Sequence, residues 1–469
     1  MTDESKPSIW PLVLMMIAAV GIYLYYSIEI TPPAIGGREK GGVEALEALA
    51  ERDDTNILFI LVDTLRSERM GVYGYERDTT PFLNAFASTG ILFDRHIAQS
   101  SWTKCSMASM WTGMNPLRAG VTKFNDTLSA EIEMPAEILQ EAGFKTVGIY
   151  RNGWVSGYFG FDQGFDKYFR PTVMQALGPA ARIKPNVLSR GTDENLIGDA
   201  IEFLRIHGKT SRWLLYLHLM DLHEYTYDEE SSLFGTTIAD IYDNSVLRTD
   251  WVLSQLYAYL HEEELLDDTL IVLISDHGEA FGERGIEGHA RSVFPETTET
   301  PFLIQLPFDL ESGVVVPERT TNVDVWPTIL DLLGLPDQGN VDGLSRKPEL
   351  IAAINGEPFS SEVADDVSMA FLDENWGKPG TPRRPAISVL DGPYRYLRGS
   401  GASGQALEVL LSTEDGQQLN RIDEYPEVAA RLREEADRQL EIKPEFEAAD
   451  VELDSMQLNQ LRALGYELP

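Results

Sequence analysis

Continuous apolar runs that end in polar residues recur along this chain, and amphipathic stretches separate them. The runs are Asn56 to Asp63, Thr146 to Tyr150, Trp213 to Leu219 and Leu270 to Ser275. Such runs are typical of strands that are buried on both faces of a parallel sheet. The stretches Met134 to Ala142 and Thr192 to Ile206 have the periodicity of helices. The alternation predicts an α/β fold with a mostly parallel sheet flanked by helices.

Polar residues stand at the ends of these predicted strands. In α/β folds, ligands bind beyond the carboxyl ends of the strands. The polar residues at these ends are Asp63, Asn152, Asp221 with His223, and Asp276 with His277. Carboxylates and neutral histidines bind divalent metals, so Asp63, Asp276 and His277 predict a metal site. His218 lies inside an apolar run, and we interpret it as a core histidine.

The pattern changes in the last part of the chain. A helix is predicted near Pro327, and short strand-like pieces follow from about residue 384, at Ala386 to Val389 and Tyr394 to Leu397. A charged helix is predicted from Glu427 to Gln439. We therefore expect a main catalytic domain over residues 55–383 and a small C-terminal α+β subdomain over residues 384–469.

The N-terminal part contains an uncharged apolar run from Ile9 to Ile28. About 20 apolar residues suffice for a helix to cross a bilayer, and aromatic residues such as Trp10 and Tyr26 favour its interfaces. The alternative is a cleaved signal peptide, but Asp3 and Glu4 spoil its positive n-region. We expect a tail over residues 1–8, a transmembrane anchor over 9–28 and a linker over 29–54.

Composition excludes one class of partner. The 469 residues include 38 Lys and Arg against 75 Asp and Glu, which gives a net charge of -37. Such a surface repels nucleic acid, so no nucleic-acid partner is expected. The single cysteine, Cys105, excludes a framework of intrachain disulfides.

Three blocks of sequence carry a resemblance to a known family. They are Val62-Asp63-Thr64-Leu65-Arg66, Trp102 to Gly113, and Ser275-Asp276-His277-Gly278-Glu279. In this order they resemble the sulfatase family of the alkaline-phosphatase superfamily. Gly160 to Asp166, His218 to His223 and Pro327 to Pro336 resemble the same family. The resemblance implies an alkaline-phosphatase-like fold and an ester hydrolase or transferase.

The resemblance also implies a site. Asp63, Asp276 and His277 would bind one divalent metal (Ca, Mn, Mg or Zn), and Thr103 would complete its coordination and act as the nucleophile. His223 matches a histidine that faces the substrate or leaving group. His289 stands where many family members place a lysine that contacts the anionic group. We expect Asn152 and Lys104 to contact the anionic group. A second metal is a further possibility, with Asp221, His223 and His289 as its ligands.

Three departures from the family pattern bear on the chemistry. Counted back from Thr112-Gly113, the slot of the family's catalytic cysteine holds Thr103, and Cys105 lies two residues later. Thr64 replaces the second aspartate of the common Asp-Asp pair, and Met107 replaces an arginine. A threonine cannot become formylglycine, but its hydroxyl can attack phosphorus.

These features leave three hypotheses. The first is a hydrolase or transferase for phosphate esters that uses Thr103 as nucleophile. The second is a true sulfuric ester hydrolase with Cys105 as its modified residue. The third is a catalytically degenerate protein that binds an anionic glycan or envelope component.

In each hypothesis the ligand is an anionic ester, a phosphate or sulfate ester of a glycan, a lipid or an envelope component. Arg38, Lys40 and Arg52 after the anchor favour a cytoplasmic catalytic domain. The membrane-anchored relatives implied by the resemblance have it outside, and because large domains cross membranes largely regardless of charge, we expect an extracytoplasmic domain.

Overall fold

A mostly parallel sheet forms the centre of the structure, a computed structural model that describes residues 35–171, 192–359, 367–447 and 451–452. Residues from Ile35 onward belong to one compact unit. The tail and the anchor predicted over residues 1–28 lie outside the described residues. Among the residues that are described, no helix combines the length and the apolar character needed to cross a bilayer.

Nine strands make up this sheet. They are β1 Asn56–Val62, β2 Ile91–Ile97, β3 Lys145–Tyr150, β4 Lys167–Phe169, β5 Trp213–Leu219, β6 Thr269–Ile274, β9 Glu299–Thr300, β10 Phe302–Gln305 and β11 Val314–Thr321. Their order is β11-β2-β10-β6-β1-β5-β3-β4, with β9 paired to β2. β9 and β10 run antiparallel to their neighbours, and the other pairings are parallel. The predicted mostly parallel sheet is confirmed.

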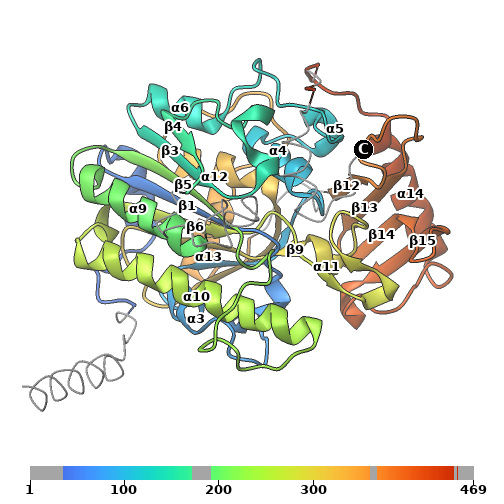
Figure 1. Cartoon of the computed structure of the whole chain (residues 1–469), viewed down its shortest axis with the longest axis horizontal. Helices are drawn as coiled ribbons and strands as arrows, with labels where there is room; N and C mark the ends of the chain where they lie inside the picture. Colours follow the sequence, from blue (N-terminus) through green and yellow to red (C-terminus); the bar gives the residue numbers. More distant parts are fainter. Residues whose placement is uncertain (1–34, 172–191, 360–366, 448–450, 453–469) are drawn as a thin grey trace, which may run out of the picture. The chain divides into compact units, whose positions relative to one another are not determined.

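Helices cover both faces of the sheet (Figure 1). The alternating side chains of β1 divide between two cores: Phe59 and Leu61 face one, and Leu58 and Ile60 face the other. The helices of the first core are α2 Val43–Ala48, α4 Thr103–Thr112, α6 Pro135–Glu141, α12 Val325–Leu332 and α13 Lys347–Asn355. Those of the second are α3 Pro81–Ala87, α9 Asp193–His207 and α10 Ile238–Glu262. The continuous apolar runs follow from this burial on both faces.

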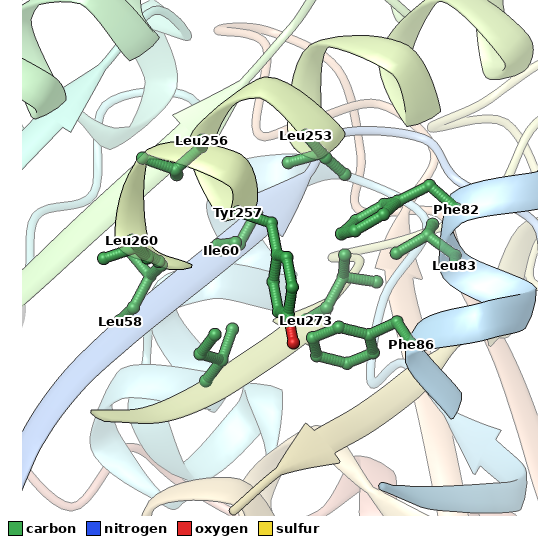
Figure 2. Close-up of a pocket in the computed structure, with 11 residues that line it drawn as sticks. Leu58, Ile60, Phe82, Leu83, Phe86, Leu253, Leu256, Tyr257, Leu260 and Leu273 are labelled. Atoms are coloured by element: carbon green, nitrogen blue, oxygen red, sulfur yellow. The ribbon is translucent and has the colours of Figure 1, made fainter. Parts of the chain in front are cut away.

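The second core is closely packed where α3 and α10 meet the sheet. Figure 2 shows Phe82 and Phe86 of α3 beside Tyr257 of α10, and Ile60 and Leu273 of the sheet line the same gap. The cavity that these side chains leave measures about 10 Å³. One water needs roughly 10–15 Å³ on this measure, so the gap is a packing defect and no ligand site.

The C-terminal part has a sheet and a core of its own. Strands β12 Ser368–Asp373, β13 Pro385–Asp391, β14 Tyr394–Ser400 and β15 Ala406–Ser412 form an antiparallel sheet in that order. Helix α14, Pro426–Leu440, packs on it through Leu432 and Ala436. The C-terminal α+β element predicted from the sequence is therefore present, and its first strand, β12, precedes residue 384.

The second half of the predicted linker packs against the large sheet. Leu46 and Leu49 are buried in the first core. The Arg38 guanidinium forms an ion pair with Asp309 at 2.8 Å, and both side chains are nearly inaccessible to solvent. Residues from Ile35 to Asp54 thus behave as part of the folded unit.

Candidate active site

Four adjacent parallel strands deliver polar side chains to one edge of the large sheet. β3, β5, β1 and β6 lie side by side in that order. The residues that follow them are Asn152, Asp221, Asp63 and, after Ser275, Asp276. Thr103 joins them as the first residue of α4, which begins directly after the extended residue Trp102. Its Oγ1 lies 3.1 Å from His277 Nε2.

Asp63, Asp276 and His277 form a fully buried group whose ligand atoms all lie within 4.8 Å of one another. His277 Nε2 is 3.4 Å from Asp276 Oδ2 and 3.8 Å from Asp63 Oδ1. Neither oxygen has a hydrogen-bond partner within the described part of the chain. Buried carboxylate oxygens without partners are costly. Two of them facing an imidazole nitrogen fit a divalent metal, which these three residues would hold.

The orientation of His277 suits a metal ligand. Its Nδ1 lies 2.9 Å from the Gly278 carbonyl oxygen. Because a carbonyl only accepts, Nδ1 carries the proton and the Nε2 lone pair points to the two carboxylates. A hydrogen bond of this kind is what fixes the tautomer of metal-binding histidines.

Asp63 is held by a chain of buried hydrogen bonds. Its Oδ2 accepts from Asn152 Nδ2 at 2.6 Å and from His218 Nε2 at 3.1 Å. His218 Nδ1 in turn lies 2.7 Å from the Tyr216 hydroxyl, which donates to it. His218 is buried, as a core histidine would be, but it also positions a predicted metal ligand.

The two carboxylates differ in their ionisation. Burial alone raises the pKa of Asp63, but His223, His218 and His277 around it lower its pKa below the ordinary value. Burial and the charge of Asp63 raise the pKa of Asp276. Without a cation between them, the pair holds its negative charge mainly on Asp63.

Asn152 links the nucleophile candidate to the metal group. Its Nδ2 also lies 3.3 Å from Thr103 Oγ1, and its Oδ1 accepts from the Trp154 backbone N–H at 2.9 Å. That backbone donor fixes which end of the amide faces the site. Asn152 thus lies between Thr103 and Asp63, and its contact with an ester stays a prediction.

Thr64 has a strained backbone and contributes through that backbone. Its φ of 65° lies in the left-handed region, which a β-branched residue rarely adopts. Its N–H donates to Asp276 Oδ1 at 3.3 Å, and its carbonyl accepts from the Tyr242 hydroxyl at 2.7 Å. Its side chain donates to the carbonyl of Asp63 at 2.6 Å. The conformation thus lets Thr64 hold the Asp276 carboxylate and the backbone of Asp63 without being a further ligand.

His223 and His289 lie together beside the metal group. Their ring centroids are 4.8 Å apart, and the His289 ring stacks on His277 at 4.6 Å. His289 Nδ1 lies 3.1 Å from Glu279 Oε2. Burial opposes protonation of His289, but Glu279 raises its pKa above the ordinary value. Burial lowers the pKa of His223 to about 4, so near neutral pH it is uncharged.

Other residues singled out from the sequence have different contacts. Lys104 is buried and donates to the Phe124 carbonyl at 2.9 Å, with its ammonium 3.9 Å from the centroid of the Phe159 ring. Asp221 pairs with Arg151 and accepts from the Asp193 N–H, so it is engaged away from His223 and His289. The carboxylate of Asp221, which the sequence analysis considered for a second metal, is therefore engaged elsewhere. Among the described residues, one group could hold a metal ion, that of Asp63, Asp276 and His277.

Cys105 and Met107 lie in the apolar core. Both are buried in the cluster that contains Phe59 and Trp111. Burial raises the pKa of the Cys105 thiol to about 12. The thiol is therefore protonated and packed, whereas the hydroxyl of Thr103 faces the metal group.

Comparison with known proteins agrees with this fold and shows the family. The family model Sulfatase matches residues 55–335. The chain belongs to the sulfatase family. The prediction drawn from the three sequence blocks is thus confirmed at the level of the family.

The relatives with which the chain aligns carry the names of different sulfatases. The rat N-acetylgalactosamine-6-sulfatase is 25% identical over 346 residues, which cover 63% of this chain and 66% of that protein. The chain thus spans just under two thirds of that relative. The ulvan-active sulfatase of Formosa agariphila is 23% identical, with 91% of this chain and 85% of that protein covered.

Solved structures show the same fold. The phosphonate monoester hydrolase of Agrobacterium radiobacter superimposes with a TM-score of 0.65 at 17% identity, over 82% of this chain and 95% of that one. Ps i-CgsB in complex with k-i-k-neocarrahexaose gives a TM-score of 0.67 at 16% identity, over 88% and 98%.

The sequence analysis did not assign a role in the site to two of its residues. They are His218, which binds Asp63, and Glu279, which binds His289. Glu279 belonged to the block Asp276-His277-Gly278-Glu279, but its partner, His289, lies ten residues later and the block does not indicate it. For His218, the signals were a histidine in an otherwise apolar strand and its place at the start of the family-like segment His218 to His223.

Proposed function

We propose that this protein is a metal-dependent sulfatase-family hydrolase or transferase that cleaves phosphate esters with Thr103 as nucleophile. One observation carries the proposal: Thr103 Oγ1 lies 3.1 Å from His277 Nε2, beside two buried carboxylate oxygens that lack partners among the described residues. This is where a hydroxyl nucleophile has to lie in order to share a cation with its substrate.

The chemistry follows from the residues around Thr103. A bound divalent metal would lower the pKa of a hydroxyl and neutralise the ester oxygens. Thr103 Oγ attacks phosphorus while the bond to the ester oxygen breaks, and its proton passes to water. The leaving oxygen takes a proton from water. A water or an acceptor hydroxyl then attacks the phosphothreonine, releases the phosphoryl group and returns Oγ to the hydroxyl.

Neighbouring side chains would orient the ester. The Asn152 amide donates to the site and is fixed by the Trp154 backbone. His289, whose pKa Glu279 raises, would contact the anionic group from the position where the family often has lysine. Neutral His223 offers Nε2, a buried atom without a partner in the described structure, to the leaving group.

The test compares substrates and variants of the full chain in detergent. Aryl phosphodiesters, phosphomonoesters and sulfates are assayed with Mn²⁺, Ca²⁺ or Zn²⁺. We expect phosphate-ester turnover that falls by about 10³-fold or more in Thr103→Ala, whereas Thr103→Ser retains a nucleophile. Trapping at low pH and peptide mass spectrometry should find phosphate on residue 103. Full turnover in Thr103→Ala would overturn the assignment.

A second candidate is a true sulfuric ester hydrolase, favoured by the names of the sulfatases with which the chain aligns. That activity would need Cys105 to be converted to formylglycine. The place of Cys105 in the apolar core argues against it, because the side chain that faces the metal group is that of Thr103. Sulfatase turnover that is lost in Cys105→Ala, with formylglycine at residue 105, would establish this candidate and displace the first.

We also propose that residues 9–28 anchor the protein with its catalytic domain outside the cytoplasm. The support is the apolar run flanked by aromatic residues. Substrates would then be phosphate or sulfate esters of glycans, lipids or envelope components. The anchor predicts that the chain stays with membranes after an alkaline wash and that external protease degrades it in intact cells. Release by the wash would contradict the anchor.

A further inference from the structure

One buried arginine connects three segments at the active-site edge of the large sheet. Arg151 directly follows β3, and its side chain is 2% exposed. Its Nη1 lies 2.6 Å from a carboxylate oxygen of Asp193, the first residue of α9, and also contacts Asp221, which follows β5. Its Nη2 lies 2.9 Å from Glu224 Oε2. The proposed reaction uses none of these four residues directly.

The contacts of Arg151 lie on both sides of His223. Asp221 comes two residues before this histidine, and Glu224 comes directly after it. The turn is closed by the backbone N–H of Thr226, which donates to the Asp221 carbonyl at 2.8 Å. A guanidinium that holds both ends of so short a turn restricts where the imidazole within it can lie.

The backbone of this turn is strained. Tyr225 adopts a φ of 52°, in the left-handed region that a residue with a bulky side chain rarely adopts. Such conformations persist only where surrounding contacts enforce them. Leu222 is buried in the second core, and Glu224, directly before the strained residue, is held by Arg151. The ion pair therefore restrains the end of the turn at which strain could be released.

Three carboxylates surround this one guanidinium, so a neutral side chain could not replace it. The Asp193 carboxylate also accepts from the backbone N–H groups of Met220 and Asp221, at 2.9 and 2.8 Å. Burial and the charge of Asp193 raise the pKa of Asp221 to about 7. Without the guanidinium, the buried carboxylates would repel one another or take up protons. The planar fork that reaches Asp221 and Glu224 at once is specific to arginine.

We propose that Arg151 is the positioning residue for His223 and holds its imidazole where Nε2 meets the leaving oxygen of the ester. The inference rests on the function proposed above, in which His223 serves the leaving group. A neutral imidazole carries one N–H, and a donor at Nε2 would stabilise the negative charge that develops on that oxygen. Poor leaving groups develop the least stable charge, so the position of His223 should matter most for them.

Steady-state kinetics of the full chain in detergent test this with aryl phosphate esters that range from nitrophenyl to phenyl. We expect Arg151→Gln to lower kcat about 10²-fold for the phenyl ester and less than about tenfold for the nitrophenyl ester, as in His223→Ala. The double variant should be no slower than His223→Ala, because the two residues act as a unit. Arg151→Lys keeps the charge but cannot reach both carboxylates, so its loss should be intermediate.

Arg38→Gln is the matched control. It also breaks a buried ion pair, that with Asp309. Arg38 Nη1 donates to the Leu266 carbonyl ahead of β6, so this pair lies at the edge of the sheet opposite to the site. The control should lower the unfolding temperature and leave the dependence on the leaving group unchanged.

A readout without turnover separates this inference from the proposed reaction. Diethyl pyrocarbonate modifies accessible imidazoles, and peptide mass spectrometry gives the rate at each histidine. In chelator, we expect His223 to react about threefold faster or more in Arg151→Gln than in the wild type, with exposed His261 as the internal reference. Glu224→Ala removes a partner that is 27% exposed, so it should fold and show smaller changes in the same direction.

Two results would overturn the proposal. One is an equal loss of kcat for all leaving groups in Arg151→Gln. The other is a wild-type rate of modification at His223 in folded Arg151→Gln or, where that variant does not fold, in Glu224→Ala. Full turnover in Thr103→Ala would refute the nucleophile alone, since both readouts of Arg151 can still be measured. If no ester is turned over, the modification rates decide.

Discussion

Thr103 Oγ1 and His277 Nε2 lie 3.1 Å apart although 174 residues separate them in the chain. The helix α4 brings the hydroxyl to the edge of the sheet, and the end of β6 brings the imidazole. The Gly278 carbonyl holds the proton of His277 on Nδ1, so Nε2 has only a lone pair toward Thr103. Both atoms are therefore directed at one point that a cation can occupy.

Removal of Asn152 should lower turnover more than substrate affinity. Asn152→Ala deletes the donors to Asp63 and Thr103, at 2.6 and 3.3 Å, and the cap on the Trp154 N–H. We expect kcat to fall about 10²-fold, the range for a lost oxyanion or positioning contact, with a smaller change in KM. Steady-state kinetics on an aryl phosphate ester measure both. Asn152→Asp keeps the cap, and equal kcat in all three proteins would contradict the role.

The chain from Tyr216 through His218 to Asp63 should set the affinity for the metal. His218→Phe removes a hydrogen bond to a ligand, and such losses typically weaken metal binding 10–100-fold. Tyr216→Phe removes only the outer bond and should have a smaller effect in the same direction. Competition with a chelating dye measures the affinity. His261→Ala, on the exposed surface of α10, is the control, and equal affinity in His218→Phe would show that the contact is structural only.

The effect of Asp276→Asn on the unfolding temperature should change sign between the metal-free and the metal-loaded protein. In chelator, the variant removes the cost that burial and the charge of Asp63 impose on ionising Asp276, so we expect its unfolding temperature to equal or exceed that of the wild type. With Mn²⁺ or Ca²⁺, the wild type gains stability by mass action, about 2.7 kcal/mol at 100 times Kd, and the variant gains little. Calorimetry in both buffers checks this. A metal-dependent gain of the same size in both proteins would place the ion elsewhere.

The sequence predicts the central strands better than the outer ones. β1, β5 and β6 are flanked by strands and covered by helices, so burial on both faces leaves continuous apolar runs. β11 has no such pattern, because Pro317, Glu318 and Arg319 interrupt it. It lies at the end of the sheet and forms through pairing with β2, a contact that local sequence does not specify.

The same distinction applies to the site. Asp63, Asn152, Asp276 and His277 follow predicted strands, so the rule for parallel sheets places them together. The contact of His218 with Asp63 depends instead on the register of β5 against β1, which pairs His218 with Leu61. A shift of one residue would turn His218 to the other face of the sheet. The register is a property of the whole sheet, so this contact could not be predicted from either strand alone.

The carboxylate of Asp250 should make stability depend on pH. It is fully buried and accepts from the backbone N–H groups of Phe82 and Leu83, each at 2.9 Å, at the start of α3. Burial raises its pKa from 3.8 to about 7. The folded protein therefore keeps this proton at pH values where the unfolded chain loses it.

Stability from Asp250 is accordingly present below about pH 4 and is lost as the pH rises toward 7, by up to about 4 kcal/mol. Asp250→Asn cannot titrate and keeps one acceptor oxygen. We expect the gap in unfolding temperature between the wild type and this variant to shift against the wild type from pH 4 to pH 7. Glu262→Gln, on the exposed surface of the same helix, should show no such shift. Parallel curves for the wild type and Asp250→Asn would mean that the buried carboxylate is ionised throughout this range.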